Sequence, residues 1–319
     1  MTTASPAASE PARAVPRPRG YTEIGYLFAA VGAFLFATKG IAIKLAYQGQ
    51  VDAATLLAAR MLLAVPIYVV IGGLAVRGRQ REGTLPSFAT AVKAALVGAL
   101  GYWIASYTDF LGLEYISAQF ERLILFTYPL FVVMFGAAFF ALPVRWRAVG
   151  AFGVSYLGLA VIFIEKSGDP GSHVALGAGL VLVSAVCFAL YQLFAKGMIG
   201  EMGPRLFTCV SMIGAAIGCF AQFLLTHPLS ALTLTPRIWE ISVYLAIGAT
   251  VLPTFFQNAA LHRISAQANS TIATLSPVIT VVLAVIVLGE HLTLTDVLGT
   301  AMVVGGVGSF TLADRRRAR

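Results

Sequence analysis

Charged residues are scarce in this chain of 319 residues. Asp, Glu, Lys and Arg make up only 11% of the sequence, whereas 58% is hydrophobic and the mean hydropathy is +0.84. One soluble core cannot hide that much apolar surface, so the composition excludes a soluble globular protein and indicates an integral membrane protein. The segments between apolar stretches are too short to form a basic soluble domain, and we therefore expect no nucleic-acid partner.

Cysteine and histidine are also rare, which limits the chemistry available. Cys187, Cys209 and Cys219 form no CxxC pair and have no histidine at ligand spacing, so we expect small buried apolar roles for them. The four histidines stand in separate turns, without an HExxH motif or a nucleophile elbow. The sequence has no ATP-binding loop either. It therefore predicts neither an enzyme nor a metal or other cofactor.

Long hydrophobic runs are what the chain has in abundance. Crossing ~30 Å of hydrocarbon takes about 20 apolar residues, and we count ten such stretches. The sequence thus predicts an all-α integral membrane protein with ten transmembrane helices. The predicted spans are residues 25–46, 53–76, 89–112, 117–141, 148–164, 174–195, 205–226, 239–260, 266–288 and 295–313.

The basic residues predict how these spans are oriented. With residues 1–21 in the cytoplasm, sixteen of the 22 Lys and Arg residues fall on the cytoplasmic side of alternating spans. This positive-inside bias predicts a multi-pass protein of the cell (inner) membrane with both termini cytoplasmic. The net charge of +8 then reflects topology. We expect residues 1–21 to be a disordered tail and residues 314–319 to be a basic tail.

The chain repeats itself at a fixed offset. Residues 116–119, Ile-Ser-Ala-Gln, recur as residues 264–267, and Pro129 recurs as Pro277, in both cases 148 residues later. A shared offset inside apolar segments indicates two copies of one unit, which we place at residues 22–166 and 172–313. Five spans per copy is an odd number, so the second copy enters the membrane from the opposite side. Two inverted five-helix repeats are typical of secondary transporters.

Several stretches together resemble the EamA family of the drug/metabolite transporter superfamily. They are Ile116-Ser117-Ala118 leading to Tyr128-Pro129, then residues 274–279, Leu288-Gly289-Glu290, and the glycine-rich segment 299–308. The resemblance implies ten helices with cytoplasmic termini, and a central cavity lined by helices one to four and six to nine, with helices five and ten at the periphery. It also implies export of small metabolites. The chain departs from the pattern at residues 141–143, where Ala-Leu-Pro replaces the Gly-Glu pair of the second copy.

Ionisable side chains inside predicted spans are the candidate substrate pathway. Placing such a group in a bilayer costs about 2.5 to 3.5 kcal/mol, so those that are retained usually face a cavity or a partner. Each charged candidate aligns with a neutral polar residue of the second copy. The charged candidates are Lys39, Arg60, Asp109, Glu121 and Arg122. Their neutral counterparts include Tyr191, Gln257, Asn269 and Ser270.

Two interpretations of the charged layer stay open at this point. Lys39 with Glu121, and Arg60 or Arg122 with Asp109, would form structural ion pairs whose only task is mutual neutralisation. Alternatively the groups line the pathway, where three cations against two anions favour a substrate with a carboxylate or phosphate. Glu121 and Asp109 are also the carboxylates deepest within spans, so they are candidate proton carriers for proton-coupled transport, with passive exchange as the rival.

Matched prolines and glycines suggest moving and packing elements. Pro129 and Pro277 fall within predicted spans, where each removes a helix hydrogen bond, and we predict that they form gating kinks rather than static bends. Glycines in residues 148–164 and 295–313 let helices approach closely. The sequence leaves open whether that packing lies within a monomer or between the subunits of a homodimer.

The sequence therefore predicts a secondary transporter, most simply an exporter of a small polar metabolite such as an amino acid or organic anion, working by alternating access. Its expected partners are this small-molecule substrate and membrane lipid. Two alternatives are a channel and a non-transporting membrane scaffold. A channel would not need the inverted repeat, because the repeat supplies alternating access. A scaffold predicts no saturable flux of any solute.

Overall fold

A computed structural model describes residues 21–140, 146–166, 173–264, 272 and 275–315. This part of the chain is helical throughout and contains no strand. Its longer helices are α1 (Tyr21–Ala37), α2 (Lys39–Tyr47), α3 (Ala53–Arg81), α4 (Phe88–Gly98), α5 (Ala105–Tyr115), α6 (Ala118–Leu125), α7 (Tyr128–Phe140), α8 (Trp146–Lys166), α9 (Val174–Thr226), α10 (Pro236–Ala246), α11 (Leu252–Arg263), α13 (Leu275–Leu283) and α14 (Leu294–Arg315). The shorter segments are η1 (Ala99–Ile104), η2 (Leu229–Leu232), η3 (Ile247–Val251) and η4 (Ala284–Leu288).

Several helices are long and apolar enough to cross a membrane, which fits the membrane protein predicted from composition. Six helical stretches of the described chain meet this criterion, and two further apolar stretches, Leu275–Leu288 and Leu294–Gly306, are shorter. The six are Glu23–Tyr47, Ala53–Arg81, Phe88–Tyr115, Ala118–Phe139, Val174–Thr226 and Pro236–Ala260. Helix α9 alone has 53 residues and contains two of the predicted spans. It changes direction at Gly203, whose φ of 70° and ψ of 157° are not helical, directly before Pro204.

Backbone turns recur at the repeat offset. Helix α5 ends at Ile116 (φ −125°, ψ 162°), and α11 ends at Ile264 (φ −121°, ψ 163°). These two extended residues stand 148 positions apart, as do the starts of the π-helical segments η1 and η3. The sequence repeat is therefore accompanied by a repeat of local backbone geometry.

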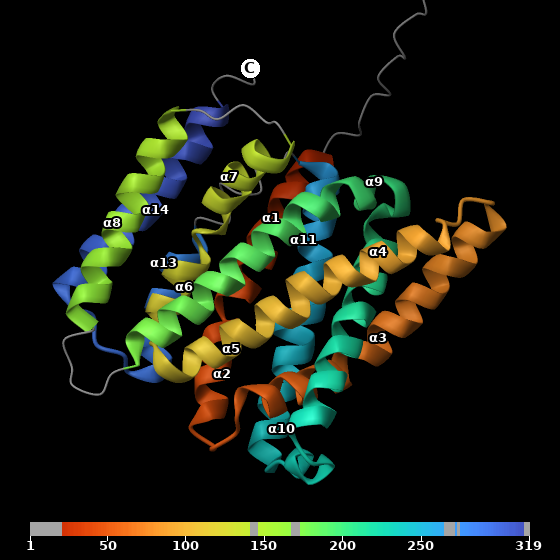
Figure 1. Cartoon of the computed structure of the whole chain (residues 1–319), viewed down its shortest axis with the longest axis horizontal. Helices are drawn as coiled ribbons and strands as arrows, with labels where there is room; N and C mark the ends of the chain where they lie inside the picture. The colour runs from red at the N-terminus through yellow and green to blue at the C-terminus, as the bar shows by residue number, and fades with distance from the viewer. Residues whose placement is uncertain (1–20, 141–145, 167–172, 265–271, 273–274, 316–319) are drawn as a thin grey trace, which may run out of the picture.

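Helix packing separates an edge pair from a central bundle. Helices α8 and α14 lie side by side at one edge of the molecule (Figure 1), where a Cβ placed on Gly158 would stand 2.8 Å from the carbonyl oxygen of Gly299. Only glycine permits that approach, so these glycines pack within the chain. The rest of the bundle joins α1 to α11, and α3, α4 and α5 to α9. The peripheral place expected for residues 148–164 and 295–313 is confirmed.

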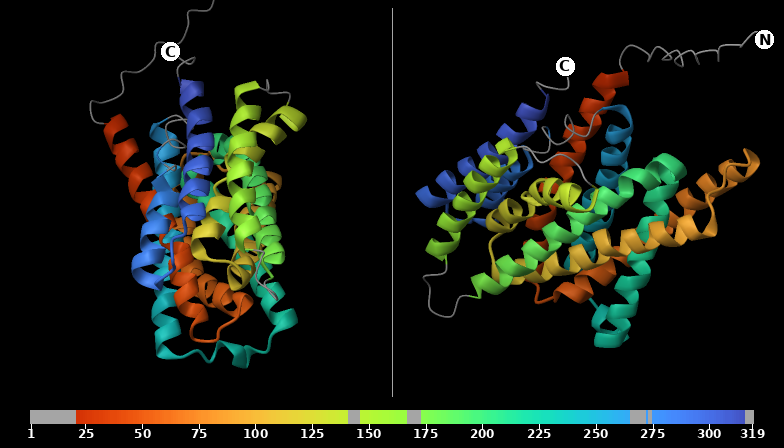
Figure 2. Two further views of the ribbon diagram at one scale, coloured as in Figure 1. Left: turned by 90° about the vertical axis from the view of Figure 1, so that its left-hand side faces the viewer. Right: turned by 45° about the horizontal axis from the view of Figure 1, so that its top comes forward.

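The described ends of the chain lie together. The beginning of α1 and the end of α14 stand at the same end of the bundle (Figure 2). The interior at its centre is built from segments of both halves, including the buried Leu57, Phe110 and Met212. Cys187, Cys209 and Cys219 are free and buried, as expected of small apolar residues.

Candidate functional site: a polar cavity between the two halves

A cavity of about 150 Å³ lies at the centre of the bundle, with residues of both halves in its wall. It is similar in volume to engineered protein cavities that hold one benzene-sized molecule, so it suits a small solute. Five predicted residues line it: Lys39, Arg60, Arg122, Tyr191 and Gln257. Asn269 and Ser270 lie outside the described residues.

Positions related by the repeat face this cavity in pairs. Gly101, Tyr102 and Ser106 line it from the first half. The residues 148 positions later, Ala249, Thr250 and Thr254, line it from the second half. Phe36 with Phe188, and Tyr128 with Ser276, complete the pattern, at offsets of 152 and 148. Equivalent positions of the two repeats thus form opposite parts of one cavity wall.

The two π-helical segments bring their residues to the wall. Segment η1 supplies Gly101 and Tyr102, and η3 supplies Ala249 and Thr250. A π-helical turn inserts one extra residue into a helix, which turns the following side chains to a new direction, and such turns are frequent at functional sites. Sequence analysis missed Thr250, Thr254, Ser106 and Asn258 because a single hydroxyl or amide in an apolar run carries little signal. The repeat offset applied to Tyr102 would have located Thr250.

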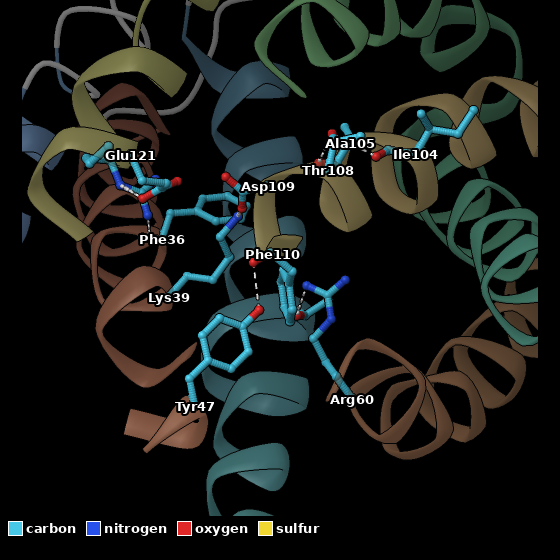
Figure 3. Close-up of polar contacts among 12 residues, drawn as sticks. Phe36, Lys39, Tyr47, Arg60, Ile104, Ala105, Thr108, Asp109, Phe110 and Glu121 are labelled. Atoms are coloured by element: carbon cyan, nitrogen blue, oxygen red, sulfur yellow. Dashed lines mark hydrogen bonds and ion pairs between the residues drawn. The ribbon is translucent and has the colours of Figure 1, made fainter. Parts of the chain in front are cut away.

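A buried ion pair joins Lys39 to Asp109. Lys39 is the first residue of α2 and Asp109 comes from α5; the Nζ to Oδ2 distance is 2.5 Å, and Asp109 is only 1% exposed (Figure 3). Thr38, between α1 and α2, keeps helical backbone angles (φ −77°, ψ −14°), and the side chain of Lys39 reaches Asp109 of the neighbouring helix α5. Asp109 lies directly behind the cavity wall rather than in it.

A second pair is formed by the neighbours Glu121 and Arg122 on α6. The Nε to Oε2 distance is 3.9 Å, and Arg122 Nη2 also donates to the carbonyl oxygen of Phe36 at 2.7 Å. Glu121 is fully buried, and neither of its oxygens has a hydrogen-bond donor among the described residues. Gly40 makes room for it, since a Cβ there would stand 3.1 Å from Glu121 Oε2.

These pairings differ from the predicted ones. The structural ion-pair interpretation, one of the two left open, paired Lys39 with Glu121, and Arg60 or Arg122 with Asp109. Instead Lys39 pairs with Asp109, and Arg122 with Glu121. Glu121 and Arg122 are neighbours in the sequence, so the second pair was within reach of sequence analysis. The first pair joins residues 70 positions apart, and only the packing of α2 against α5 brings them together.

Arg60 has no such partner. Its side chain from α3 is almost fully buried at 3% exposure, and no carboxylate of the described chain lies within 4.0 Å of it. The guanidinium packs over the Phe110 ring, 4.9 Å from the centroid, and Nη1 donates to Thr250 Oγ1 at 3.4 Å. Nε and Nη2 are buried without a hydrogen-bond acceptor in the described structure. Phe110 stands between Arg60 and Lys39 (Figure 3).

The second half surrounds the cavity with neutral groups that bond to one another. Tyr191 meets Tyr102 edge to face, with 4.9 Å between ring centroids. Asn258 donates to Thr208, and Thr254 shares a 2.9 Å hydrogen bond with Tyr68. This wall offers hydroxyl, amide and aromatic groups but no ion pair among the described residues.

The two prolines stand near the first described residues of α7 and α13. Helix α6 ends at Leu125, and α7 begins at Tyr128, so Pro129 is the second residue of α7. Pro277 is the third residue of α13. A first turn needs no donor from proline, which is why a helix tolerates it there. In the first half the expected kink corresponds to a turn at Phe126 and Thr127 between α6 and α7, and the residues directly before α13 lie outside the described residues.

The sequence belongs with proteins that move solutes across membranes. The profile of the EamA-like transporter family matches residues 23–164 and, a second time, residues 175–312. An uncharacterized transporter of Bacillus subtilis, YcbK, is 30% identical over 288 residues, covering 86% of this chain and 88% of its own. The threonine/homoserine exporter RhtA of Escherichia coli K12 is 27% identical over 220 residues, covering 67% of this chain and 69% of its own.

Structural comparison agrees at the level of fold. A protein of known crystal structure superposes with a TM-score of 0.63, covering 93% of this chain and 97% of its own, at 18% sequence identity. Identity this low supports a shared fold alone. With the family profile covering nearly all of the described helices, this chain is a member of the EamA-like transporter family, and it is a membrane transporter rather than an enzyme.

Proposed function

We propose that this protein is a secondary transporter that exports a small polar metabolite by alternating access. One observation carries the proposal: repeat-related residues of both halves line a single polar cavity of about 150 Å³. If two copies enter the membrane in opposite directions, the same contacts close either end of such a cavity in turn. Residues 22–166 and 172–313 are the proposed repeats, with ten transmembrane helices in total.

In the proposed topology the protein lies in the inner membrane of the cell, and both termini lie in the cytoplasm. The positive-inside distribution supports this orientation. The shared end of α1 and α14 in Figure 2 supports an even number of crossings. Because described residues of a single chain line the cavity from both halves, we propose that a monomer suffices for transport and that a homodimer would contain two separate pathways.

The proposed pathway consists of the cavity residues and the charges behind them. Lys39, Arg60, Arg122, Tyr191 and Gln257 line the cavity, and Asp109 and Glu121 are buried behind it. Asn269 and Ser270 stay proposed pathway residues on the repeat alignment alone. A wall that combines paired charges, hydroxyls and amides suits a polar solute. The relative RhtA is a threonine/homoserine exporter, which supports an amino-acid-like substrate and outward transport.

We also propose that Glu121 carries a proton, with Asp109 as its neighbour. Glu121 is fully buried, its oxygens accept no hydrogen bond from the described residues, and its cation partner stands at 3.9 Å rather than in close contact. Such a carboxylate gains by protonation when substrate charge enters or leaves nearby. Glu121→Gln should keep exchange of substrate but lose its response to an imposed pH gradient. A gradient response equal to that of the wild type would contradict this role.

Pro129, which follows the turn between α6 and α7, and Pro277 of α13 are the proposed gating points. Both prolines are buried, and residues next to them, Tyr128 and Ser276, line the cavity. A small rotation of α7 or α13 would therefore change the cavity directly. Pro129→Ala would then slow exchange without changing its half-saturating concentration.

Counterflow in proteoliposomes tests the proposed function. The full chain is preloaded with unlabelled amino acids, organic acids or sugars, and uptake of the same labelled solute is followed. Saturable exchange is expected for at least one small polar solute. Flux that rises linearly with concentration would identify a channel, and no flux of any solute would favour a scaffold.

A further inference from the structure

The three cations at the cavity are not equivalent. Lys39 and Arg122 each have a carboxylate partner, whereas Arg60 has none among the described residues. With both carboxylates ionised, the cluster of Lys39, Arg60, Asp109, Glu121 and Arg122 carries one uncompensated positive charge. That charge is located on Arg60, in the cavity wall.

Burying a cation without a counter-ion costs free energy, and Arg60 would regain part of it by binding an anion. Burying a charge without a counter-ion costs several kcal/mol, which packing over an aromatic ring repays only in small part. Arg60 is 3% exposed, and its only hydrogen bond in the described structure is the long 3.4 Å contact to Thr250. Arg60 also lines the cavity, so space for a partner lies beside it.

The free edge of the guanidinium has a defined geometry. Nη1 faces Thr250, while Nε and Nη2 are buried without acceptors. Nε–H and Nη2–H point in parallel along one edge of the planar group, which is the fork that binds both oxygens of a carboxylate. Lysine would offer a point charge here, without that two-point match.

We propose that Arg60 binds the carboxylate of a small monocarboxylic substrate, while Asp109 pairs with Lys39 and the ionised form of Glu121 pairs with Arg122. This inference rests on the proposed transport function and names its substrate class. One free positive charge matches one carboxylate, and the cavity of about 150 Å³ limits the remainder of the solute to a few heavy atoms. The aromatic side of the cavity, Tyr102, Tyr191 and Phe188, faces that remainder.

The test compares carboxylates with analogues that lack the carboxylate. The probes are L-threonine, L-homoserine and lactate, each beside its carboxamide, and an organic amine. Two readouts are taken on the full chain: counterflow in proteoliposomes, and thermal stabilisation of the detergent-solubilised protein, which detects binding without transport. The variants are Arg60→Gln and Arg60→Lys, with Arg237→Gln as the control, because Arg237 lies outside the cavity, exposed, and pairs with Glu240.

Arg60→Gln should raise the half-saturating concentration of the carboxylate on the order of tenfold or more, and abolish the preference over the carboxamide. Arg60→Lys should fall between wild type and Arg60→Gln, and Arg237→Gln should match wild type. Without ligand, Arg60→Gln should unfold at the same temperature as wild type or a higher one, because it removes an uncompensated charge. A lower unfolding temperature would make Arg60 structural and overturn the proposal.

The remaining outcomes separate the site from the function. Transport of carboxamides or amines alone, or carboxylate transport unchanged in Arg60→Gln, overturns the carboxylate site and leaves the transporter standing. Carboxylate binding that depends on Arg60, without flux of any probe, overturns the transporter and supports the site. Neither binding nor flux of any probe overturns both.

Discussion

The two sides of the cavity differ in the kind of polar side chain that they bury. The first half buries charges and neutralises them in pairs, Lys39 with Asp109 and Glu121 with Arg122. The second half has Tyr191 and Gln257 at the equivalent positions. A neutral group can lose its partner at the cost of one hydrogen bond, whereas an ion cannot. The charged side should therefore be intolerant of single substitutions and the neutral side tolerant.

Breaking the Lys39–Asp109 pair should have the largest effect. Asp109→Asn leaves a buried ammonium uncompensated, and removing one partner of a buried pair costs about 3–5 kcal/mol. We expect a marked fall in unfolding temperature and in the yield of folded protein. Gln257→Leu, the matched change in the second half, should cost no more than about 1 kcal/mol, because the Gln257 side chain carries no charge.

Removing both charges sharpens the same comparison. Lys39→Met combined with Asp109→Leu should recover most of the stability lost in Asp109→Asn, since well-packed apolar replacements of a buried pair are often neutral or stabilising. Equal unfolding temperatures for Asp109→Asn and Gln257→Leu would show that the two sides do not differ.

A methyl group at Gly101 should have a smaller effect. Its Cβ would stand 2.4 Å from Cγ of Tyr191, whereas the repeat-related residue, Ala249, already carries a Cβ. Overpacking of this kind costs about 1–3 kcal/mol, and the displaced ring would enter the cavity. Thermal unfolding and counterflow should both report a loss in Gly101→Ala. Gly179→Ala, with no atom within 4 Å of the added Cβ, should match wild type in both assays.

The contact between Glu290 and α6 links the two halves. Glu290 Oε1 accepts the backbone N–H of Ala118 at 3.0 Å, at the beginning of the helix that carries Glu121. Position 142, which is 148 residues earlier, is a leucine and has no acceptor to offer in return. Glu290→Ala should cost about 1 kcal/mol, as for loss of a helix cap. Glu240→Ala, in an exposed pair, should change the unfolding temperature very little, and a larger loss there than in Glu290→Ala would refute the cap.

The smallest effect is expected at Asp52, the cap of the helix that carries Arg60. Burial works to raise the pKa of Asp52, but hydrogen bonds from Thr55 outweigh it and hold this pKa below its ordinary value of 3.8. A lowered folded-state pKa stabilises the protein above the unfolded-state pKa, and this contribution is lost as the pH falls through the folded-state pKa. Thus Asp52→Ala should cost about 1 kcal/mol at neutral pH, with the difference from wild type shrinking in acid.

Asp52→Asn provides the control for that experiment. An asparagine still caps the helix but does not titrate in this range. The Asp52→Asn variant should therefore lose less stability than wild type on acidification. A pH profile of Asp52→Asn identical to that of wild type would exclude Asp52 as the titrating group.

Much of the fold was predictable because its signals are local. Span length, the offset of 148 residues and the motif stretches all lie in the sequence, and they identified a membrane transporter of the correct family. The repeat alignment also paired Lys39 with Tyr191, and in the structure both residues line the same cavity. Ionisable residues in apolar spans are rare enough to be noticed one by one, which is why every described member of the charged layer lies in or directly behind the cavity wall.

The sequence by itself thus determined a helical membrane protein with a repeated unit and a charged central layer, because hydropathy and periodicity act over short stretches of chain. Only the tertiary structure decided which charges pair. The packing of α2 against α5 brings Lys39 to Asp109, whereas Arg122 stays beside its sequence neighbour Glu121. Arg60 is left alone as a result. Electrostatic partners depend on distances of a few ångströms between helices, and no linear pattern records those distances.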